Sequence, residues 1–90
     1  MKNYKIYTLK NPITNEIRYI GVTTAKYLSI RLSQHWYNAN HNKQTHVSKW
    51  IRHIKCKPII ELLEECNENN WEDREKYWIK TLPRLTNHHE

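Results

Sequence analysis

An acidic side chain stands at an unexpected place in the stretch WEDREKYWIKTL, residues 71–82. Read as a helix, this stretch gathers four apolar side chains on one face, namely Trp71, Trp78, Ile79 and Leu82. Glu75 falls in the middle of that face. Burying an unpaired polar group costs about 1–3 kcal/mol, and burying a charge costs more. We therefore expect Glu75 either to form an ion pair, for example with Arg31, or to be a ligand for Mg²⁺, which typically takes one or two carboxylates.

Gly21 is the only glycine in the chain, and it follows Tyr19 by two positions in a stretch rich in β-forming residues. Glycine inside a strand often marks a bulge, or a place where a ligand or another backbone approaches closely. Tyr7 belongs to an earlier stretch of the same kind. Two tyrosines side by side on a sheet usually only pack against each other, but they could do chemistry where their hydroxyls reach a cleft.

Arg31 and His35 lie four residues apart, which places them on one side of a helix. The ordinary interpretation of such a pair is a solvated helix edge. The same two residue types are also suited to a phosphate site, because arginine binds phosphate oxygens as a fork and histidine carries protons near neutral pH.

A zinc site is the competing interpretation of the remaining metal-binding residue types, which are His46, His53, Cys56, Cys66, His88 and His89. No CxxC or HxxxH-type spacing is present among them, so we do not expect a structural zinc site. The two cysteines are too few for a disulfide framework, and we expect free thiols in a reducing compartment.

Two alternating stretches, residues 4–9 and 17–22, are predicted to pair as a β-hairpin around the loop that contains Pro12. A loop centred near residue 13 would set Tyr7 opposite Tyr19, with Lys5 and Gly21 on the same face. The edge of the sheet or its back would carry Tyr4, Ile6, Ile20 and Val22.

Three helices and one more strand complete the expected order β-β-α-α-β-α. The first helix should begin after Thr23 or Thr24 and run to about residue 37, and the second should begin at its cap Thr45. Residues 59–63 form a short apolar run that predicts a central or well-covered strand. The last helix should be capped by Asn70, carry Asp73 in its first turn and end before residue 83, which is proline. We therefore predict an α+β fold with a small three-stranded antiparallel sheet flanked by helices, in a single domain over residues 1–87, followed by a polar tail at residues 88–90.

The 90-residue chain carries a formal net charge of +6, which points to a polyanion such as nucleic acid as the partner. A membrane-surface helix is disfavoured, because no stretch pairs a wide apolar face with a basic one. We see no signal peptide and no apolar run long enough to span a membrane, and so expect a soluble, cytoplasmic protein.

Taken in order, the residues described above resemble the GIY-YIG nuclease family. The similarity rests on KIY at residues 5–7, YIG at residues 19–21, Arg31 with His35, and then REKYWI and LTN, which contain Glu75 and Asn87. It covers nearly the whole chain. Lys5 stands where the family name has glycine. The stretch from residue 46 to residue 65 is similar to phage and bacterial members, which suggests a phage or mobile-element origin.

The resemblance implies a metal-dependent DNA endonuclease that leaves 5′-phosphate and 3′-hydroxyl ends. By the resemblance, Tyr7 would orient or deprotonate the attacking water, with help from Tyr19, His35, Lys5 or the charge of the metal and phosphate. Arg31 would hold the scissile phosphate, and His35 would relay or donate a proton. Glu75 would bind Mg²⁺, for which Mn²⁺ could substitute.

Lys5, Gly21 and Asn87 are predicted to contact substrate, and the five catalytic residues are expected to meet in one pocket. One site cuts one strand at a time. We expect a monomer in solution, and double-strand cutting would need a second copy on DNA or a re-orientation. Two alternatives stay open, a nucleic-acid-binding module that has lost catalysis and a protein-interaction domain of the same fold.

Overall fold

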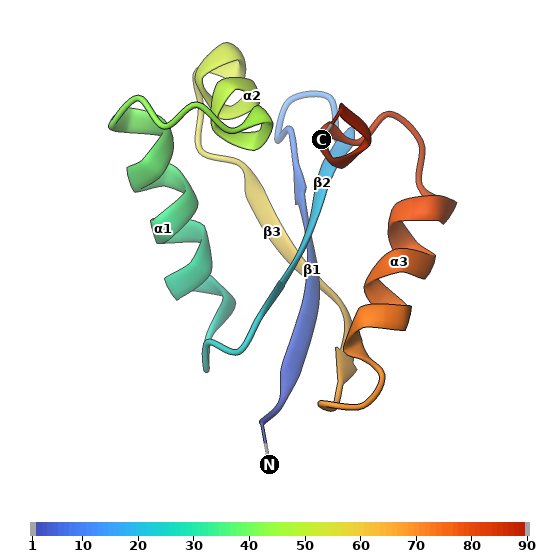
Figure 1. Cartoon of the computed structure of the whole chain (residues 1–90). Coiled ribbons are helices and arrows are strands. Elements are labelled where there is room, and N and C mark those ends of the chain that lie inside the picture. Colours follow the sequence, from blue (N-terminus) through green and yellow to red (C-terminus); the bar gives the residue numbers. More distant parts are fainter. Residues whose placement is uncertain (1, 90) are drawn as a thin grey trace.

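The computed structural model describes residues 2–89, with side chains for residues 2–87. The elements follow one another as β1 (Tyr4–Lys10), β2 (Ile17–Thr23), α1 (Leu28–Asn40), α2 (His46–Ile54), β3 (Ile59–Cys66), α3 (Trp71–Thr81) and the 3-10 helix η1 (Thr86–His89). Figure 1 shows their arrangement, and the predicted α+β fold with a three-stranded antiparallel sheet is confirmed. Residues 88 and 89 of the predicted polar tail belong to η1, and residue 90 lies outside the described residues, so the predicted boundary between domain and tail stays a prediction.

The strand order is β2-β1-β3, so β1 is the central strand. The prediction that residues 59–63 form a central or well-covered strand is therefore wrong. β3 is an edge strand that continues to Cys66, and Ile59 and Leu62 are 39% and 48% exposed. An apolar run of five residues cannot distinguish an edge strand from a central one, because that depends on which partners the rest of the chain supplies.

The predicted register of the hairpin is wrong by two residues. Tyr7 lies opposite Gly21 and Leu9 opposite Tyr19, and the register shifts between Leu9 and Lys10, where β2 accommodates one extra residue. A shift of two keeps every side chain on its predicted face, because side chains alternate with a period of two. The consequence is local but important, since Tyr7 now faces the glycine instead of Tyr19.

Two apolar clusters cover the two faces of the sheet. The first joins Tyr7 and Leu9 to the buried sides of α1 and α2, and its other buried members are Ala39, Val47, Trp50 and Ile51. The second joins Ile6 and Ile20 to α3 and the segment after it, with Trp71, Trp78, Ile79 and Leu82 packed against it. The molecule thus has three layers, with α1 and α2 on one face and α3 on the other (Figure 1). No helix in the described part of the chain combines the length and the apolar character that crossing a membrane requires.

The helix ends follow the capping signals only in part. Thr45 caps α2 as predicted, since its Oγ1 accepts the Ser48 N–H at 3.3 Å. α1 begins at Leu28, several residues later than predicted, because Thr23 accepts the Ala25 N–H and holds the chain in a loop. Asn70 precedes α3 but directs its side chain back to the Asn67 N–H, so it gives no side-chain cap.

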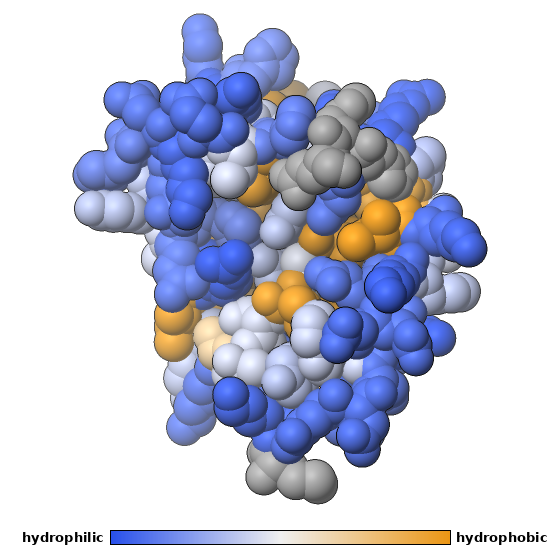
Figure 2. Space-filling view, viewed as in Figure 1, coloured by the Kyte–Doolittle hydropathy of each residue, from blue (hydrophilic) through white to orange (hydrophobic). Residues whose placement is uncertain are grey.

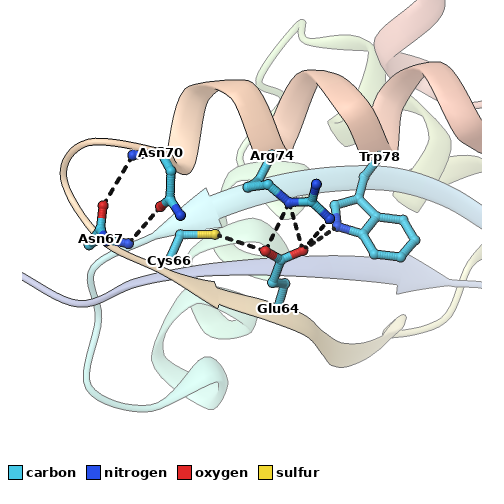
Figure 3. A network of polar contacts seen from close by, with 6 residues as sticks. All are labelled: Glu64, Cys66, Asn67, Asn70, Arg74 and Trp78. Carbon is cyan, nitrogen blue, oxygen red and sulfur yellow. Dashed lines mark hydrogen bonds and ion pairs between the residues drawn. The ribbon is translucent and has the colours of Figure 1, made fainter.

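A polar network on β3 fixes the position of α3 (Figure 3). Glu64 accepts hydrogen bonds from Arg74 Nε at 2.9 Å and from the indole N–H of Trp78 at 3.1 Å. The Arg74 guanidinium, followed by the Trp78 N–H, holds the pKa of the Glu64 carboxyl below its usual range. Because Arg74 and Trp78 lie one turn apart, this single carboxylate sets the rotation of α3 about its axis, and with it the direction of Glu75.

Candidate active site

Three of the predicted catalytic side chains form a continuous chain of hydrogen bonds beneath α1. The hydroxyl of Tyr7 lies 2.7 Å from His35 Nε2, and Arg31 Nε donates to the same hydroxyl at 3.1 Å. Tyr7 comes from the central strand and is fully buried, while Arg31 and His35 lie one turn apart on α1. The four-residue spacing on the helix therefore places a cation and an imidazole on the two sides of one phenol.

The protonation of this chain follows from its burial. Desolvation, followed by the nearby charge of Arg31, lowers the pKa of His35 to about 4, so its imidazole is neutral at pH 7. Burial, followed by the neighbouring Tyr19, raises the pKa of the Tyr7 hydroxyl well above its ordinary value. Arg31 can only donate. The hydroxyl of Tyr7 therefore accepts from Arg31 and donates to the lone pair of His35 Nε2, and the proton of His35 is on Nδ1.

Gly21 makes room for the Tyr7 ring. A Cβ built at position 21 would lie 2.5 Å from Tyr7 Cζ, closer still to Tyr7 Oη, and 2.8 Å from Tyr19 Cε2. The backbone conformation of Gly21 is one that other residues also adopt, because its φ is not positive. Glycine is thus needed here for the close approach of two aromatic rings, which the register between β1 and β2 brings directly over it.

Tyr19 completes the aromatic part of the site. Its ring centroid lies 6.2 Å from that of Tyr7 and 5.3 Å from the His35 imidazole, which it meets edge to face. Tyr19 is partly exposed, in contrast to Tyr7. Of the two tyrosines, it is the one whose side chain reaches the surface.

Arg31 stands between two cavities, of about 480 and 180 Å³, and lines both. The larger one follows the end of β2, with walls that include Thr23 and Thr24. Gln34 lines it too and accepts from Arg31 Nη1 at 2.9 Å. Gln34 was not among the predicted site residues, and the signal for it in the sequence was its position three residues after Arg31, on the same helix face.

Lys5 and Asn87 have structural partners in this arrangement. The Lys5 ammonium donates to the carbonyl oxygen of Ala25 at 3.2 Å and so ties β1 to the loop before α1. The Asn87 carboxamide binds both backbone groups of Ile20, accepting from its N–H at 3.0 Å and donating to its carbonyl at 2.9 Å. Asn87 thereby occupies the outer edge of β2 midway between Tyr19 and Gly21. The prediction that these two side chains contact substrate stays a prediction.

Glu75 lies apart from the other four predicted catalytic residues. It belongs to α3, which packs on the sheet face opposite Tyr7, and it lines neither of the two cavities that Arg31 lines. The prediction of one pocket shared by all five side chains is therefore not met. The physical reason is that β1 and β2 alternate, so Tyr7 and Tyr19 face α1 while the helix that carries Glu75 covers the other side.

The environment of Glu75 nevertheless suits a cation. Within residues 2–87 its carboxylate has no hydrogen bond and no ion pair, and partial burial, followed by the charge of Glu72, raises its pKa. No cluster of three or more histidine, cysteine or acidic side chains able to hold a metal is found among the described side chains. A single carboxylate still fits Mg²⁺, which commonly binds proteins through one or two carboxylates and completes its shell with water and phosphate.

Comparison with known proteins identifies the family. The sequence model of the GIY-YIG catalytic domain family matches residues 3–88, which is nearly the whole chain. Comparison of this chain with curated proteins and with solved structures found no match. The match includes β1 and β2 with Tyr7, Tyr19 and Gly21, the α1 pair and α3. The chain therefore belongs to the GIY-YIG catalytic domain family, which is a family of nucleases.

Proposed function

We propose that this protein is a metal-dependent DNA endonuclease that hydrolyses phosphodiester bonds to 5′-phosphate and 3′-hydroxyl ends. The observation that supports this most strongly is the buried chain Arg31–Tyr7–His35, which holds a cation at the rim of two cavities beside a proton acceptor. Family membership and the net charge of +6 supply the substrate class, because a cationic surface binds the DNA backbone.

Arg31 is the residue proposed to hold the scissile phosphate. Its Nε and Nη1 are engaged by Tyr7 and Gln34, and among the described residues its Nη2 has no partner. Two of its nitrogens are thus anchored, and three of the five N–H donors of the guanidinium are left for a ligand in the cavities. A fixed guanidinium stabilises the extra negative charge of the transition state without reorganising during the reaction.

Tyr7 and His35 are proposed to move the proton of the attacking water. A free phenolate at Tyr7 is unfavourable, because burial raises the pKa of its hydroxyl. A relay avoids this state, since Tyr7 can pass its own proton to His35 Nε2 while it takes one from water. Substrate binding would assist, because a phosphate bound at Arg31 would offset the positive charge that helps to lower the pKa of His35.

Glu75 is proposed to hold Mg²⁺, with Mn²⁺ as a substitute. α1 and α3 flank the edge strand β2 on its two sides (Figure 1), so a DNA strand lying across β2 could meet Arg31 on one side and Glu75 on the other. In Figure 2, hydrophilic residues cover α1 and α2 on one side and α3 on the other, with pale and hydrophobic residues between them. When bound, the metal ion would supply charge neutralisation at the phosphate and the leaving oxygen.

The decisive experiment is nicking of supercoiled plasmid by the full chain, with Mg²⁺ or with EDTA. We expect nicking with Mg²⁺ only, and a loss of at least about 100-fold in Glu75→Ala while DNA binding persists. Glu68→Ala removes the same charge from an exposed turn just before α3 and serves as the matched control. Sealing of the nicks by a DNA ligase alone would establish 5′-phosphate and 3′-hydroxyl ends.

Equal nicking by Glu75→Ala and the parent would refute the metal-binding role. Salt-sensitive DNA binding without cleavage under any divalent metal would refute the nuclease and favour an inactive nucleic-acid-binding module.

A further inference from the structure

The charges of this chain are sharply separated along the sequence. Residues 17–60 contain eight lysines and arginines and no acidic residue, whereas seven of the nine acidic residues lie between positions 61 and 75. The acid-free segment comprises β2, α1 and α2, and the acidic segment comprises β3 and most of α3. A polyanion is therefore attracted to one side of the molecule, the side of α1 and α2.

The smaller cavity beside Arg31 lies within this acid-free segment. Its volume of about 180 Å³ equals that of about six water molecules in the liquid. Its wall is formed by Tyr19, Arg31, His35, Asn38, Lys43, Thr45, Val47 and Ser48. The first turn of α2 forms one side, so the positive end of that helix faces the cavity.

Several polar groups in this wall have no partner within the described part of the chain. Ser48 is only 2% exposed, yet no hydrogen bond engages its hydroxyl, although the residue lines the cavity. The side chains of Asn38 and Lys43 are likewise without a hydrogen bond or ion pair. These side chains are therefore available to a ligand in the cavity.

The backbone adds a further donor and fixes the loop. The side-chain oxygen of Thr45 accepts a hydrogen bond from the Ser48 N–H, and the Thr45 carbonyl accepts one from the Lys49 N–H. The Val47 N–H, in the first turn of α2, is left without a hydrogen-bond partner among the described residues. Arg52 Nη1 donates to the carbonyls of Ala39 and Lys43 at 3.0 and 2.9 Å. The loop that carries Lys43 is therefore held against the cavity.

We infer that this cavity is a second phosphate site, which binds a backbone phosphate of the DNA strand next to the one held at Arg31. The inference rests on the proposed function. The groups without a partner can all donate hydrogen bonds. Two cations line the wall and, among the described side chains, no acidic one does, which is the composition of an anion site. Arg31 lines both cavities, so neighbouring phosphates of one strand would lie on its two sides.

The first test uses inorganic phosphate as the probe and ¹⁵N-labelled full-length protein in NMR. We expect a saturable shift of the Val47 amide signal. The affinity for phosphate should fall about fivefold in Lys43→Gln, the upper value for an exposed charged contact. Ser48→Ala should also weaken binding without moving the apo spectrum beyond its neighbours. An unmoved Val47 signal, or equal affinity in Lys43→Gln, would overturn the inference.

The second test asks whether the DNA backbone uses the same site. Binding of a short duplex in EDTA is measured by fluorescence anisotropy against salt concentration. Lys43→Gln should reduce the slope of log K against log salt by about 0.9, the value for one neutralised phosphate. Lys80→Gln, an exposed lysine of α3 beyond the acid-free segment, should leave the slope unchanged. If the slope of log K against log salt were the same in Lys43→Gln as in the parent, the cavity would bind free phosphate only, and its proposed role in DNA binding would be overturned.

Failure of this inference and failure of the nuclease can be told apart. Plasmid nicking with no response of Val47 to either probe would refute the second phosphate site and leave the nuclease standing. A response of Val47 together with the slope change, in a protein that never cleaves DNA, would support the second site and refute the catalytic proposal.

Discussion

Replacing Gly21 by alanine should damage this protein, although the backbone there is ordinary. At an unobstructed strand position, the same change should stabilise the protein by about 0.4–1 kcal/mol, because alanine has less freedom in the unfolded chain. Here the new Cβ would lie 2.5 Å from Tyr7 Cζ and 2.8 Å from Tyr19 Cε2, whereas carbon atoms at rest are about 3.5–4.0 Å apart. The two rings must therefore move by about 1 Å.

The displacement affects both stability and activity. Overpacking of this size costs about 1–3 kcal/mol. Gly21→Ala should therefore lower the free energy of unfolding, whereas the same substitution at an unobstructed strand position should raise it. Tyr7 is tethered to Arg31 and His35 by hydrogen bonds of 3.1 and 2.7 Å and cannot move without stretching them. A displacement of about 1 Å in a catalytic group can cost about 100-fold in rate, and we expect a loss of that order in plasmid nicking.

The assay is urea unfolding of Gly21→Ala, Tyr7→Phe and the double variant, each compared with the parent. Tyr7→Phe removes the atom nearest to the new Cβ and the tethers of the ring, so Gly21→Ala should cost less in that background. A Gly21→Ala protein as stable and as active as the parent would show that glycine is not needed at position 21 to make room for the rings of Tyr7 and Tyr19. An equal cost in both backgrounds would show that the hydrogen bonds of Tyr7 do not hold its ring in place.

Three further predictions concern other parts of the structure. The pKa of His35 is about 4 in the folded protein and near 6.5 in the unfolded chain, so the unfolded state binds more protons between these values. The contribution of His35 to the free energy of unfolding should therefore be fully present above about pH 6.5, and the free energy of unfolding should fall by about 2 kcal/mol between pH 7 and pH 4.5. In His35→Gln, urea unfolding should show a smaller fall over the same pH range. Asn87→Ala removes two hydrogen bonds to Ile20, and we expect the free energy of unfolding in urea to fall by about 1–3 kcal/mol. An unchanged midpoint would show that these hydrogen bonds do not stabilise the fold. Burial, followed by the charge of Glu64, raises the pKa of the Cys66 thiol, so a thiol reagent should modify the partly exposed Cys56 first, and equal rates would contradict the burial of Cys66.

Local patterns in the sequence predicted the parts of the fold that depend on local rules. The order of the elements follows from periodicity and from capping signals such as Thr45. The assignment of Tyr7 and Tyr19 to one sheet face survived a register error of two residues, because a strand repeats every two residues. The spacing of Arg31 and His35 likewise determined that they would lie together, since four residues is about one helical turn.

Other features depend on contacts between distant segments. Asn87 binds Ile20 across 67 residues of sequence, and no pattern around either residue indicates the pairing. The placement of β3 at the edge, and the rotation of α3 set by Glu64 and Arg74, likewise arise from how the elements pack.

By itself, the sequence determined the element order, the composition of each face, the excess positive charge and the identity of the chemically capable residues. Only the tertiary structure decided that Tyr7 lies over Gly21, because one extra residue in β2 sets the register there. It alone also decided that Glu75 lies across β2 from Arg31, since that depends on which sheet face α3 covers. The physical reason is that periodicity fixes directions within an element, whereas the distance between elements is fixed by the packing of side chains far apart in the chain.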